Sequence, residues 1–535
     1  MASSQQEEEK IPLKVFIDKQ HNKVVAVEST KDFVDTLFSF LSLPLSTIIR
    51  LLTKQQHQHQ QPLSILGSIT NLYQSVQNLN QNHFFNAVCK HMLLCPRNPC
   101  DSLCWKLFFN IDDTEPTPRF LVCEYCTTKF TTFRDLICSC GCGKPVNRKP
   151  YDLDWELGKK NNGDVNEDDD DAKCGVFVKE NGSLFLVFDD LTVVPSSLVT
   201  SLQMLHQLGY SDLNQLDEVT RSIGKEEILN LLKYSITSYE PLTNTILASD
   251  SKEKDKQLNP FASAIRVLRP STNESKMDVK IVLSKSQNKI IFAEAKEDFV
   301  NFIFSLLTIP LGSIVKKLDG NSSVGCIDNL YRSVETLDSS RCTDSRSVLL
   351  NPGVAPQYGC PNQPLNIPEG ELPTYYYGKG TWEPDPLYSS RKREVTRSDG
   401  VVSKSNSGIV NVKSLTALDP RSPKRLKESV VGFVRRPALY AVGDDLRVRS
   451  LSGGSCISYL KELNLAIDDL EMKVISIGEA EALSLLRASL TSKQALTTGL
   501  KDFLDVPRQE SNLASKCTHT SRLDDLLKEE PNPEP

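Results

Sequence analysis

Residues 13–52 read LKVFIDKQHNKVVAVESTKDFVDTLFSFLSLPLSTIIRLL, and the pattern returns at residues 279–318 as VKIVLSKSQNKIIFAEAKEDFVNFIFSLLTIPLGSIVKKL. The two stretches align without a gap at a constant offset of 266 residues. Because self-similarity at a fixed spacing marks a repeated structural unit, the sequence predicts that one unit occurs twice. Identical aligned residues, numbered in the first stretch, include Lys14, Asn22, Lys23, Glu28, Asp32, Phe33, Val34, Phe38, Pro44 and Leu45.

The similarity continues beyond this stretch. Residues 67–79 (GSITNLYQSVQNL) return at 325–337 as GCIDNLYRSVETL, and Ile223-Gly224 near the end of the first copy correspond to Ile477-Gly478. Each copy is about 230–240 residues long, which lies within the range of a single domain. We therefore predict a first domain at 11–248, a linker at 249–276 and a second domain at 277–505. The ends at 1–10 and 506–535 are polar and are predicted to be disordered.

Four segments carry a resemblance to a known family. They are the hairpin followed by FSFLSLPL, the segment G-x-I-x-N-L-Y-x-S-V, the run LLCPRNPC and the segment S-I-G-x-E-E-x-L-x-L-L. The chain resembles a plant-specific family catalogued as domain of unknown function 674, once per copy over nearly its whole length. The resemblance implies a plant origin and two tandem copies. It brings no catalytic residue with it.

Composition is that of a globular protein. Apolar residues make up 39% of the chain, charged residues 24%, and the net charge is -6. This mildly acidic balance argues against a nucleic-acid surface over the whole protein. The start, MASSQQEEEK, lacks the features of a secretory signal. We therefore expect a cytoplasmic or nuclear protein whose fifteen cysteines stay reduced and serve as metal ligands or buried thiols.

Periodicity predicts an α+β fold. Residues 13–18 and 23–28 are β-branched runs typical of a hairpin, and residues 30–43 have helical spacing that Pro44 ends. Residues 299–315 contain no charge, so a membrane span is the alternative to a buried helix. We favour the buried helix and expect no span, because the first copy has only fourteen uncharged residues here and each copy has a central proline.

Later segments complete each predicted domain, in which β-hairpins pack on helices. Ser68 is predicted to cap a helix over residues 69–79. Residues 175–179 and 183–188 are predicted to form a hairpin with Asn181-Gly182 as its turn. Residues 196–208 and 225–237 are predicted to be closing helices. Their expected core residues are Leu205, Leu208, Ile228, Leu231 and Leu232.

Ten of the fifteen cysteines lie between positions 89 and 174. Two thiolates three residues apart can bind one face of a tetrahedral zinc ion, and a second group can close it. Gly141 and Gly143 leave the backbone free to wrap around an ion. Buried, unliganded thiols and a catalytic zinc are the alternatives. The predicted ligands of a structural zinc are Cys123, Cys126, Cys138, Cys140 and Cys142, and a looser group that might add a ligand is Cys95, Cys100 and Cys104.

The second copy carries a basic insertion at about residues 387–430. Arg391-Lys392-Arg393 and Lys424-Arg425 are candidates for nuclear import or phosphate contact, although a solvated flexible loop is the favoured interpretation. If the protein binds nucleic acid at all, we expect the basic segment 391–436 to make the contact.

The sequence contains no phosphate-binding loop, no H-E-x-x-H, no G-x-S-x-G and no dinucleotide fingerprint. We therefore predict a non-enzymatic module that binds an unidentified protein partner and is held in its first copy by zinc. Two alternatives remain: an enzyme acting through the first-copy cysteines, and a nuclear or nucleic-acid factor acting through the basic segment.

Overall fold

We analysed a computed structural model of the whole chain. The segments predicted to be the disordered N-terminus, the linker and the disordered tail lie almost entirely outside the residues that the structure describes, as do residues 387–393, 399–408 and 423–430 of the basic insertion. The proposed division into two domains therefore stays a prediction. The described residues are 9–56, 66–114, 121–123, 125–126, 128–148, 175–179, 184–247, 276–360, 363–372, 375–380, 394–398, 409–422, 431–435, 438–451 and 455–504.

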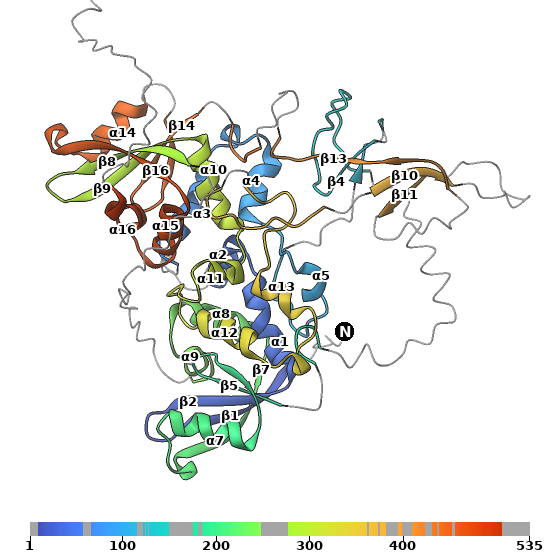
Figure 1. Cartoon of the computed structure of the whole chain (residues 1–535), viewed down its shortest axis with the longest axis vertical. Coiled ribbons are helices and arrows are strands. Elements are labelled where there is room, and N and C mark those ends of the chain that lie inside the picture. Colours follow the sequence, from blue (N-terminus) through green and yellow to red (C-terminus); the bar gives the residue numbers. More distant parts are fainter. Residues whose placement is uncertain are drawn as a thin grey trace, which may run out of the picture.

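A five-stranded antiparallel sheet lies at one end of the molecule (Figure 1). Its order is β6-β5-β2-β1-β7. The predicted hairpin is confirmed as β1 and β2, and Asn22 in its turn has a φ of 49°, which asparagine tolerates better than most residues. The strands are β1 (Ile11–Asp18), β2 (Lys23–Ser29), β5 (Phe185–Phe188), β6 (Val193–Pro195) and β7 (Leu216–Ile223).

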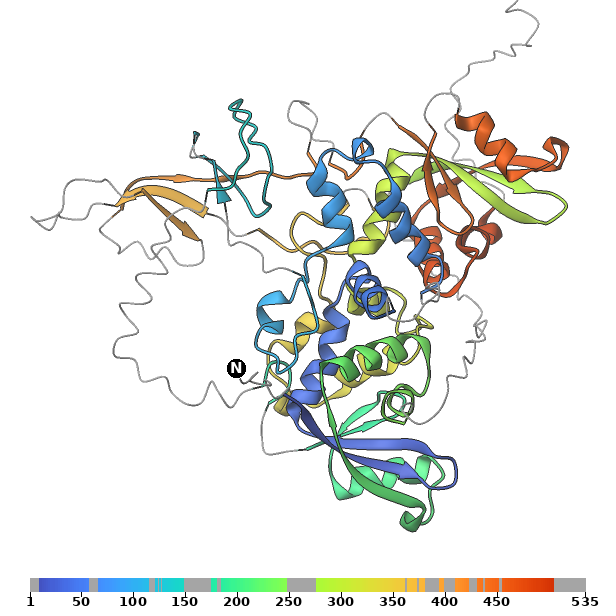
Figure 2. The ribbon, with the colours of Figure 1, turned by 180° about the vertical axis from the view of Figure 1, so that it is seen from behind.

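A second five-stranded antiparallel sheet lies at the opposite end (Figures 1 and 2). Its order is β15-β14-β9-β8-β16. Asn288 in the β8–β9 turn has the same φ of 49° as Asn22. The strands are β8 (Met277–Ser284), β9 (Lys289–Lys296), β14 (Leu439–Gly443), β15 (Val448–Ser450) and β16 (Leu470–Ile477).

Many helices fill the space between the two sheets, whereas α7 (Leu198–Gln207) lies on the outer side of the first sheet and α14 (Ser455–Leu463) on the outer side of the second (Figure 1). The helices in the first part of the chain are, in chain order, α1 (Lys31–Ser39), η1 (Phe40–Ser42), α2 (Leu45–Gln56), α3 (Ile69–Asn78), η2 (Gln81–His83), α4 (Ala87–Leu94), α5 (Asp101–Cys104), α7 (Leu198–Gln207), η4 (Leu213–Gln215), α8 (Lys225–Thr237) and α9 (Pro241–Ile246). Those in the second part are α10 (Glu297–Ser305), η6 (Leu306–Thr308), α11 (Leu311–Lys317), α12 (Ile327–Thr336), η7 (Ser339–Arg341), α13 (Arg346–Leu350), α14 (Ser455–Leu463), η8 (Ile467–Asp469), α15 (Glu479–Thr491), α16 (Ala495–Leu500) and η9 (Lys501–Phe503). The fold class is α+β, as predicted.

Short strands form two smaller sheets at the side of this body (Figure 1). One has the order β13-β4-β3 and the other β11-β10-β12. Their strands are β3 (Leu121–Val122), β4 (Lys129–Thr131), β10 (Tyr375–Gly380), β11 (Glu394–Ser398), β12 (Ile409–Ser414) and β13 (Thr416–Ala417).

The prolines end helices where the sequence predicted. The helix after β2 stops at η1, two residues before Pro44, and α2 begins immediately after that proline. Residues 299–315 are likewise divided among α10, η6 and α11, and the side chains of this segment are buried in the protein. No helix within the described ranges is both long and apolar enough to cross a bilayer.

Three local predictions are wrong. Val178 bridges Cys342 rather than joining a hairpin with residues 185–188, whose strand pairs with β2 and β6. Ser68 precedes α3, but its hydroxyl makes no cap and instead donates to the carbonyl of Ser492. Leu205 and Leu208, which were predicted to be core residues, are not buried, and Leu208 is 52% exposed; α7, which contains Leu205 and ends just before Leu208, buries none of its residues fully.

Candidate metal centre

Residues 121–148 build a small unit around the predicted cysteines. Strands β3 and β4 pair antiparallel, so the turn between them carries Cys123 and Cys126. A second turn closes where the amide of Val146 donates to the carbonyl of Leu136 at 2.8 Å and the amide of Cys138 donates to the carbonyl of Lys144 at 3.0 Å. Two turns thus present the two groups of cysteines to each other.

Glycine shapes the second turn. Gly141 and Gly143 have φ values of 96° and 66°, in the left-handed region that residues with a Cβ rarely adopt. The chain can therefore double back between Cys138 and Cys142, which brings three thiols to one place. Their conformations agree with the expectation that Gly141 and Gly143 let the backbone wrap around an ion.

Two pairs of these sulfur atoms lie at the separation that tetrahedral zinc coordination produces. The ligand atoms of Cys123, Cys126, Cys138 and Cys140 all lie within 4.8 Å of one another. Sγ of Cys123 is 3.9 Å from that of Cys140, and Sγ of Cys126 is 3.8 Å from that of Cys138. A zinc ion with Zn–S bonds of about 2.3 Å holds its sulfurs about 3.8 Å apart. Disulfide sulfurs would be about 2.05 Å apart, so these thiols are not paired covalently.

The fifth predicted ligand lies at the edge of this group. Sγ of Cys142 is 3.8 Å from that of Cys123, and Cys142 is not among the four thiols that are all mutually close. The structure therefore brings all five predicted cysteines together, and Cys142 is the one in excess of a four-ligand site.

The five thiols differ in their exposure to solvent. Cys123 and Cys138 are buried, Cys126 and Cys142 are intermediate, and Cys140 is exposed. Burial disfavours ionisation of Cys126, but hydrogen bonds involving Thr128 and the thiols of Cys123 and Cys138 together lower the pKa of Cys126 to about 7. A thiolate near neutral pH suits a metal ligand, because the thiol must lose its proton to bind.

The looser cysteines belong to other surroundings. Cys104 is buried, and its Sγ lies 3.6 Å from the side-chain amide of Asn98 and 3.7 Å from the hydroxyl of Ser42. Burial raises the pKa of Cys104 to about 11. Among the described residues, the group that could hold a metal ion comprises cysteines 123, 126, 138 and 140, and Cys95, Cys100 and Cys104 are not part of it.

Comparison with known proteins identifies the family. The model of the family described as "Protein of unknown function (DUF674)" matches residues 7–480. The chain belongs to this family. Neither a search of curated proteins nor a search of solved structures found a match. The family assignment predicted from the sequence is thereby confirmed, and it assigns no activity.

In this DUF674 protein the cysteine unit is attached to a distant part of the chain. Strand β13 lies parallel to β4, and the amides of Thr416 and Leu418 donate to the carbonyls of Thr128 and Phe130 at 2.9 and 2.8 Å. Leu418 also joins Cys123 in the small apolar core of the unit. Sequence reasoning missed this contact, because pairing between remote strands leaves no local signal.

Arg421 fixes the segment that follows β13. Its buried guanidinium donates to both carboxylate oxygens of Asp419, to Glu369 and to the carbonyl of Gly359. Arg421 lies inside the predicted basic insertion, so its part of that insertion is not the solvated loop that we predicted. The clusters at 391–393 and 424–425 lie outside the described residues.

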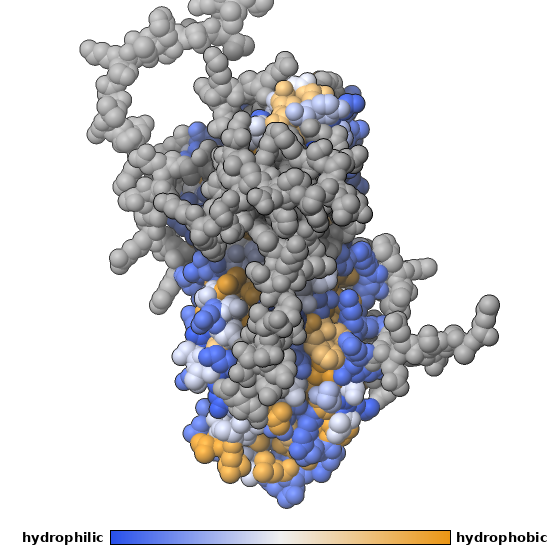
Figure 3. Space-filling view, turned by 90° about the vertical axis from the view of Figure 1, so that its right-hand side faces the viewer, coloured by the Kyte–Doolittle hydropathy of each residue, from blue (hydrophilic) through white to orange (hydrophobic). Residues whose placement is uncertain are grey.

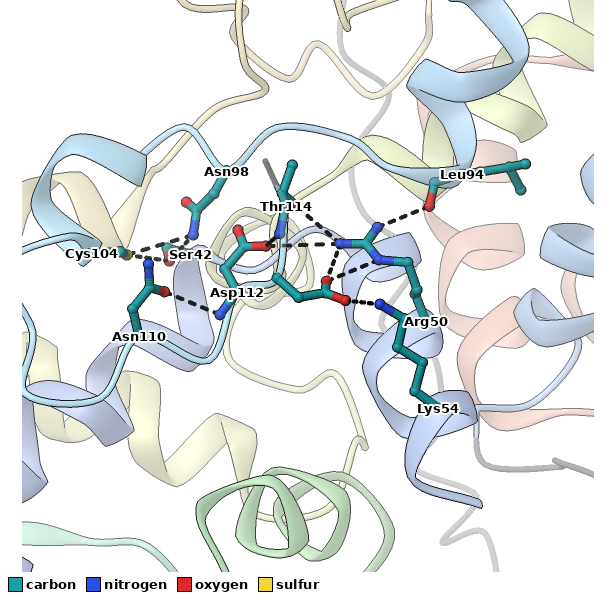
Figure 4. A network of polar contacts seen from close by, with 10 residues as sticks. Ser42, Arg50, Lys54, Leu94, Asn98, Cys104, Asn110, Asp112 and Thr114 are labelled. Atoms are coloured by element: carbon teal, nitrogen blue, oxygen red, sulfur yellow. Dashed lines mark hydrogen bonds and ion pairs between the residues drawn. The ribbon is translucent and has the colours of Figure 1, made fainter. Parts of the chain in front are cut away.

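A second polar network supports the body of this DUF674 protein (Figure 4). The Arg50 guanidinium, whose side chain is 11% exposed, donates to Asp113, to Thr114 and to the carbonyl of Leu94, and Lys54 also binds Asp113. Burial disfavours the charged form, but Asp113 raises the pKa of Arg50 above its usual value. This network satisfies a buried cation, and we assign it a structural role.

Proposed function

We propose that this DUF674 protein is a non-enzymatic binding protein of a reducing compartment and that its cysteine unit holds one structural zinc. The observation that supports the zinc most directly is the set of Sγ–Sγ distances of 3.8–3.9 Å. The ligands are four of the five thiols of Cys123, Cys126, Cys138, Cys140 and Cys142.

The chemistry of the ligands supports a structural site. Four thiolates fill the coordination sphere of zinc, whereas catalytic sites keep one position open for water or substrate. The lowered pKa of Cys126 would also suit a nucleophile, which is the enzymatic alternative. Hydrogen bonds with Thr128 and with the thiols of Cys123 and Cys138 account for the lowered pKa, and the further thiols beside Cys126 favour metal binding over nucleophilic attack.

The unit also has reason to need a metal. The buried hydrophobic residues beside the cysteines are Leu121, Leu136 and Val146, together with Leu418 from the distant strand, and a second small cluster joins Val122 and Phe130 to Leu415. So few apolar side chains cannot offset the ordering of a loop of this length, and small units often depend on metal for that reason. Zinc bound here would order β4 and, through β4, the contact with β13.

A protein-binding role is supported by exposed apolar surface. Leu198, Val199 and Leu202 on α7 are 79%, 64% and 50% exposed. Figure 3 shows apolar surface at the end of the molecule that carries the first sheet. Side chains of this kind favour contact with another apolar surface.

Metal analysis tests the zinc. Protein purified without added metal should contain one zinc per chain by mass spectrometry. The double variant Cys123→Ser, Cys126→Ser should contain none, whereas the matched control Cys95→Ser, outside the cluster, should keep it. Zinc should also protect residues 121–148 from protease, and chelation should remove that protection. Wild-type protein without zinc, or a double variant that retains it, would reject the proposal.

A further inference from the structure

Contacts between the first half (residues 9–247) and the second half (residues 276–504) occur in exchanged pairs. Helix α3 of the first half packs against β15 of the second, and α12 of the second packs against β6 of the first. Ser75 on α3 accepts the amide of Val448 at 3.0 Å, while Ser333 on α12 accepts the amide of Val193 at 2.9 Å. Ser75 and Ser333 are aligned residues of the two copies.

A second pair lies one turn earlier on the same helices. The side-chain amide of Asn71 donates to the carbonyl of Asp445 at 3.0 Å, and that of Asn329 donates to the carbonyl of Asp190 at 3.0 Å. Each helix therefore binds the turn between two strands of the other half through the same two residue types.

The two chains also cross at the prolines. The amide of Leu45 donates to the carbonyl of Ile309 at 3.2 Å, and the amide of Leu311 donates to that of Leu43 at 3.1 Å. Leu45 aligns with Leu311 and Leu43 aligns with Ile309 at the offset of 266, so the two bonds are equivalent with the two halves exchanged. Such a contact lies on the axis that would relate two equivalent halves.

A third set joins the loops after α3 and α12 to the other half. The amide of Phe85 donates to the carbonyl of Phe433 at 3.1 Å, and the amide of Thr343 donates to that of Phe177 at 3.0 Å. These bonds place Phe84 beside Val434 and Val178 beside Cys342 in isolated bridges.

A glycine in each half allows the backbone of the other half to approach closely. A Cβ at Gly67 would lie 2.6 Å from the carbonyl oxygen of Ser489, and one at Gly325 would lie 2.3 Å from that of Ser235. Both glycines have positive φ, at 37° and 47°. Neither position accepts a side chain while the halves stay in contact.

An interface in which residue i of one unit contacts residue j of the other, and j contacts i, is that of a two-fold dimer. We call the surface formed by these reciprocal contacts, which involve α3, α12 and the prolines after η1 and η6, the exchange surface. We propose that the exchange surface is a self-recognition surface whose partner is a second copy of the same unit. The other half of the chain supplies that partner, and a second copy of this chain supplies it when the two halves cannot meet. The buried core supports this, because its main cluster draws on residues of both halves without interruption. Neither half is then an independent folding unit.

The first test cuts the full chain between its halves. A specific protease site inserted between residues 260 and 261 allows cleavage after folding. The two fragments should co-elute at the mass of the intact chain, 59.8 kDa, in size-exclusion chromatography with light scattering. They should still do so after chelation, because β4 and β13 are not part of the exchanged contacts. Fragments that separate as folded species overturn the proposal, and so does separation that requires only a chelator.

A matched pair of substitutions shows whether the exchange surface holds the fragments. In the cleaved protein, Gly325→Val should abolish co-elution because its side chain meets the Ser235 carbonyl. Gly209→Val should leave co-elution intact, since Gly209 also has positive φ but nothing lies within 4 Å of its Cβ position. Equal behaviour of the two variants would mean that other contacts join the halves.

The second test asks whether a second chain can serve as partner. Deleting residues 248–275 leaves about 3.8 Å between the Cα atoms of Leu247 and Lys276, although α9 and β8 lie in different parts of the molecule (Figure 1). The variant should show a native circular dichroism spectrum and twice the mass of one chain. A folded monomer would overturn pairing between chains. If the variant does not fold, the cleavage test alone decides.

Discussion

Asp35 carries a charge in an environment that disfavours it. The residue is 3% exposed, and its carboxylate accepts the amides of Val176, Phe177 and Val178 at 2.7–2.9 Å. Burial raises the pKa of Asp35 to about 6, although these three bonds and Lys31 oppose the shift. At the aligned position, Asn301 does the same work without a charge by accepting the amides of Phe433 and Val434. The substitution Asp35→Asn therefore tests what the charge costs.

The size of the effect follows from the pKa. An ordinary value of 3.8 and a folded value of about 6 differ by about two units, or about 3 kcal/mol. The folded state holds the proton more tightly, so the contribution of Asp35 to stability is complete below pH 3.8 and is lost as pH rises through about 6. Asparagine has one acceptor oxygen, so the bond from Val176 is lost at a cost of about 1 kcal/mol. Relative to wild type, Asp35→Asn should be about 1 kcal/mol less stable near pH 4 and about 2 kcal/mol more stable near pH 7.5.

Urea unfolding at a series of pH values measures this difference. Asn301→Asp is the matched reverse change and should lose stability with rising pH as Asp35→Asn gains it. Asp189, whose pKa burial raises to about 6 as well, contributes to the pH dependence of every variant and cancels in the comparison. If the difference between Asp35→Asn and wild type is the same at pH 4 and pH 7.5, the reasoning from burial is refuted.

Two further predictions concern buried side chains. Arg421→Met should destabilise the protein by about 3 kcal/mol in urea unfolding, because it leaves Asp419 and Glu369 without their cation; Arg421→Lys should lose less, and equal losses would contradict the role of the guanidinium. Burial raises the pKa of Cys89 to about 12, so in native protein at pH 8 this thiol should resist iodoacetamide while exposed Cys140 reacts once a chelator is present. Mass spectrometry of labelled peptides measures both rates, and equally fast labelling of Cys89 would contradict its burial.

The sequence predicted those parts of the fold that depend on local pattern. The first hairpin and the helix that ends before Pro44 are present, and residues 225–237 are the bounds of α8. Periodicity missed β7 and β16, which are edge strands. Strand β7 reads LDEVTRSI, and charged residues protect such edges from further pairing while they weaken the alternation that marks a strand.

The errors arose where tertiary contacts prevailed over local signals. Asn181-Gly182 favours a hairpin, yet Val178 bridges Cys342 in the other half of the chain. Ser68 stands where a cap is expected, yet its hydroxyl bonds to Ser492. Both residues lie in the exchange surface, where the competing partner is remote in sequence. Cysteine spacing, by contrast, located the candidate metal centre, because ligands close in sequence are brought together by short turns.

The exchanged contacts pair equivalent residues of the two halves, but within the described ranges the cysteine unit has no equivalent in the second half. Sequence alignment sets Cys123 against Gly378 and Cys126 against Thr381, so the aligned stretch in the second half of the chain lacks these thiols. Strand β13 of the second half pairs with β4 of the first half, and the described residues contain no equivalent pairing with the two halves exchanged. The exchanged contacts do not include this unit. The cysteines of the unit lie in a small core of their own, while Phe133 and Thr132 attach its middle to the body through the main core and Arg97. Removal of zinc should therefore loosen the two cysteine turns and the pairing of β4 with β13, while the cooperative unfolding of the two-sheet body is unchanged. With the proposed zinc site, metal supply would control the structure of the cysteine unit, and any binding that depends on it, separately from the folding of the two-sheet body.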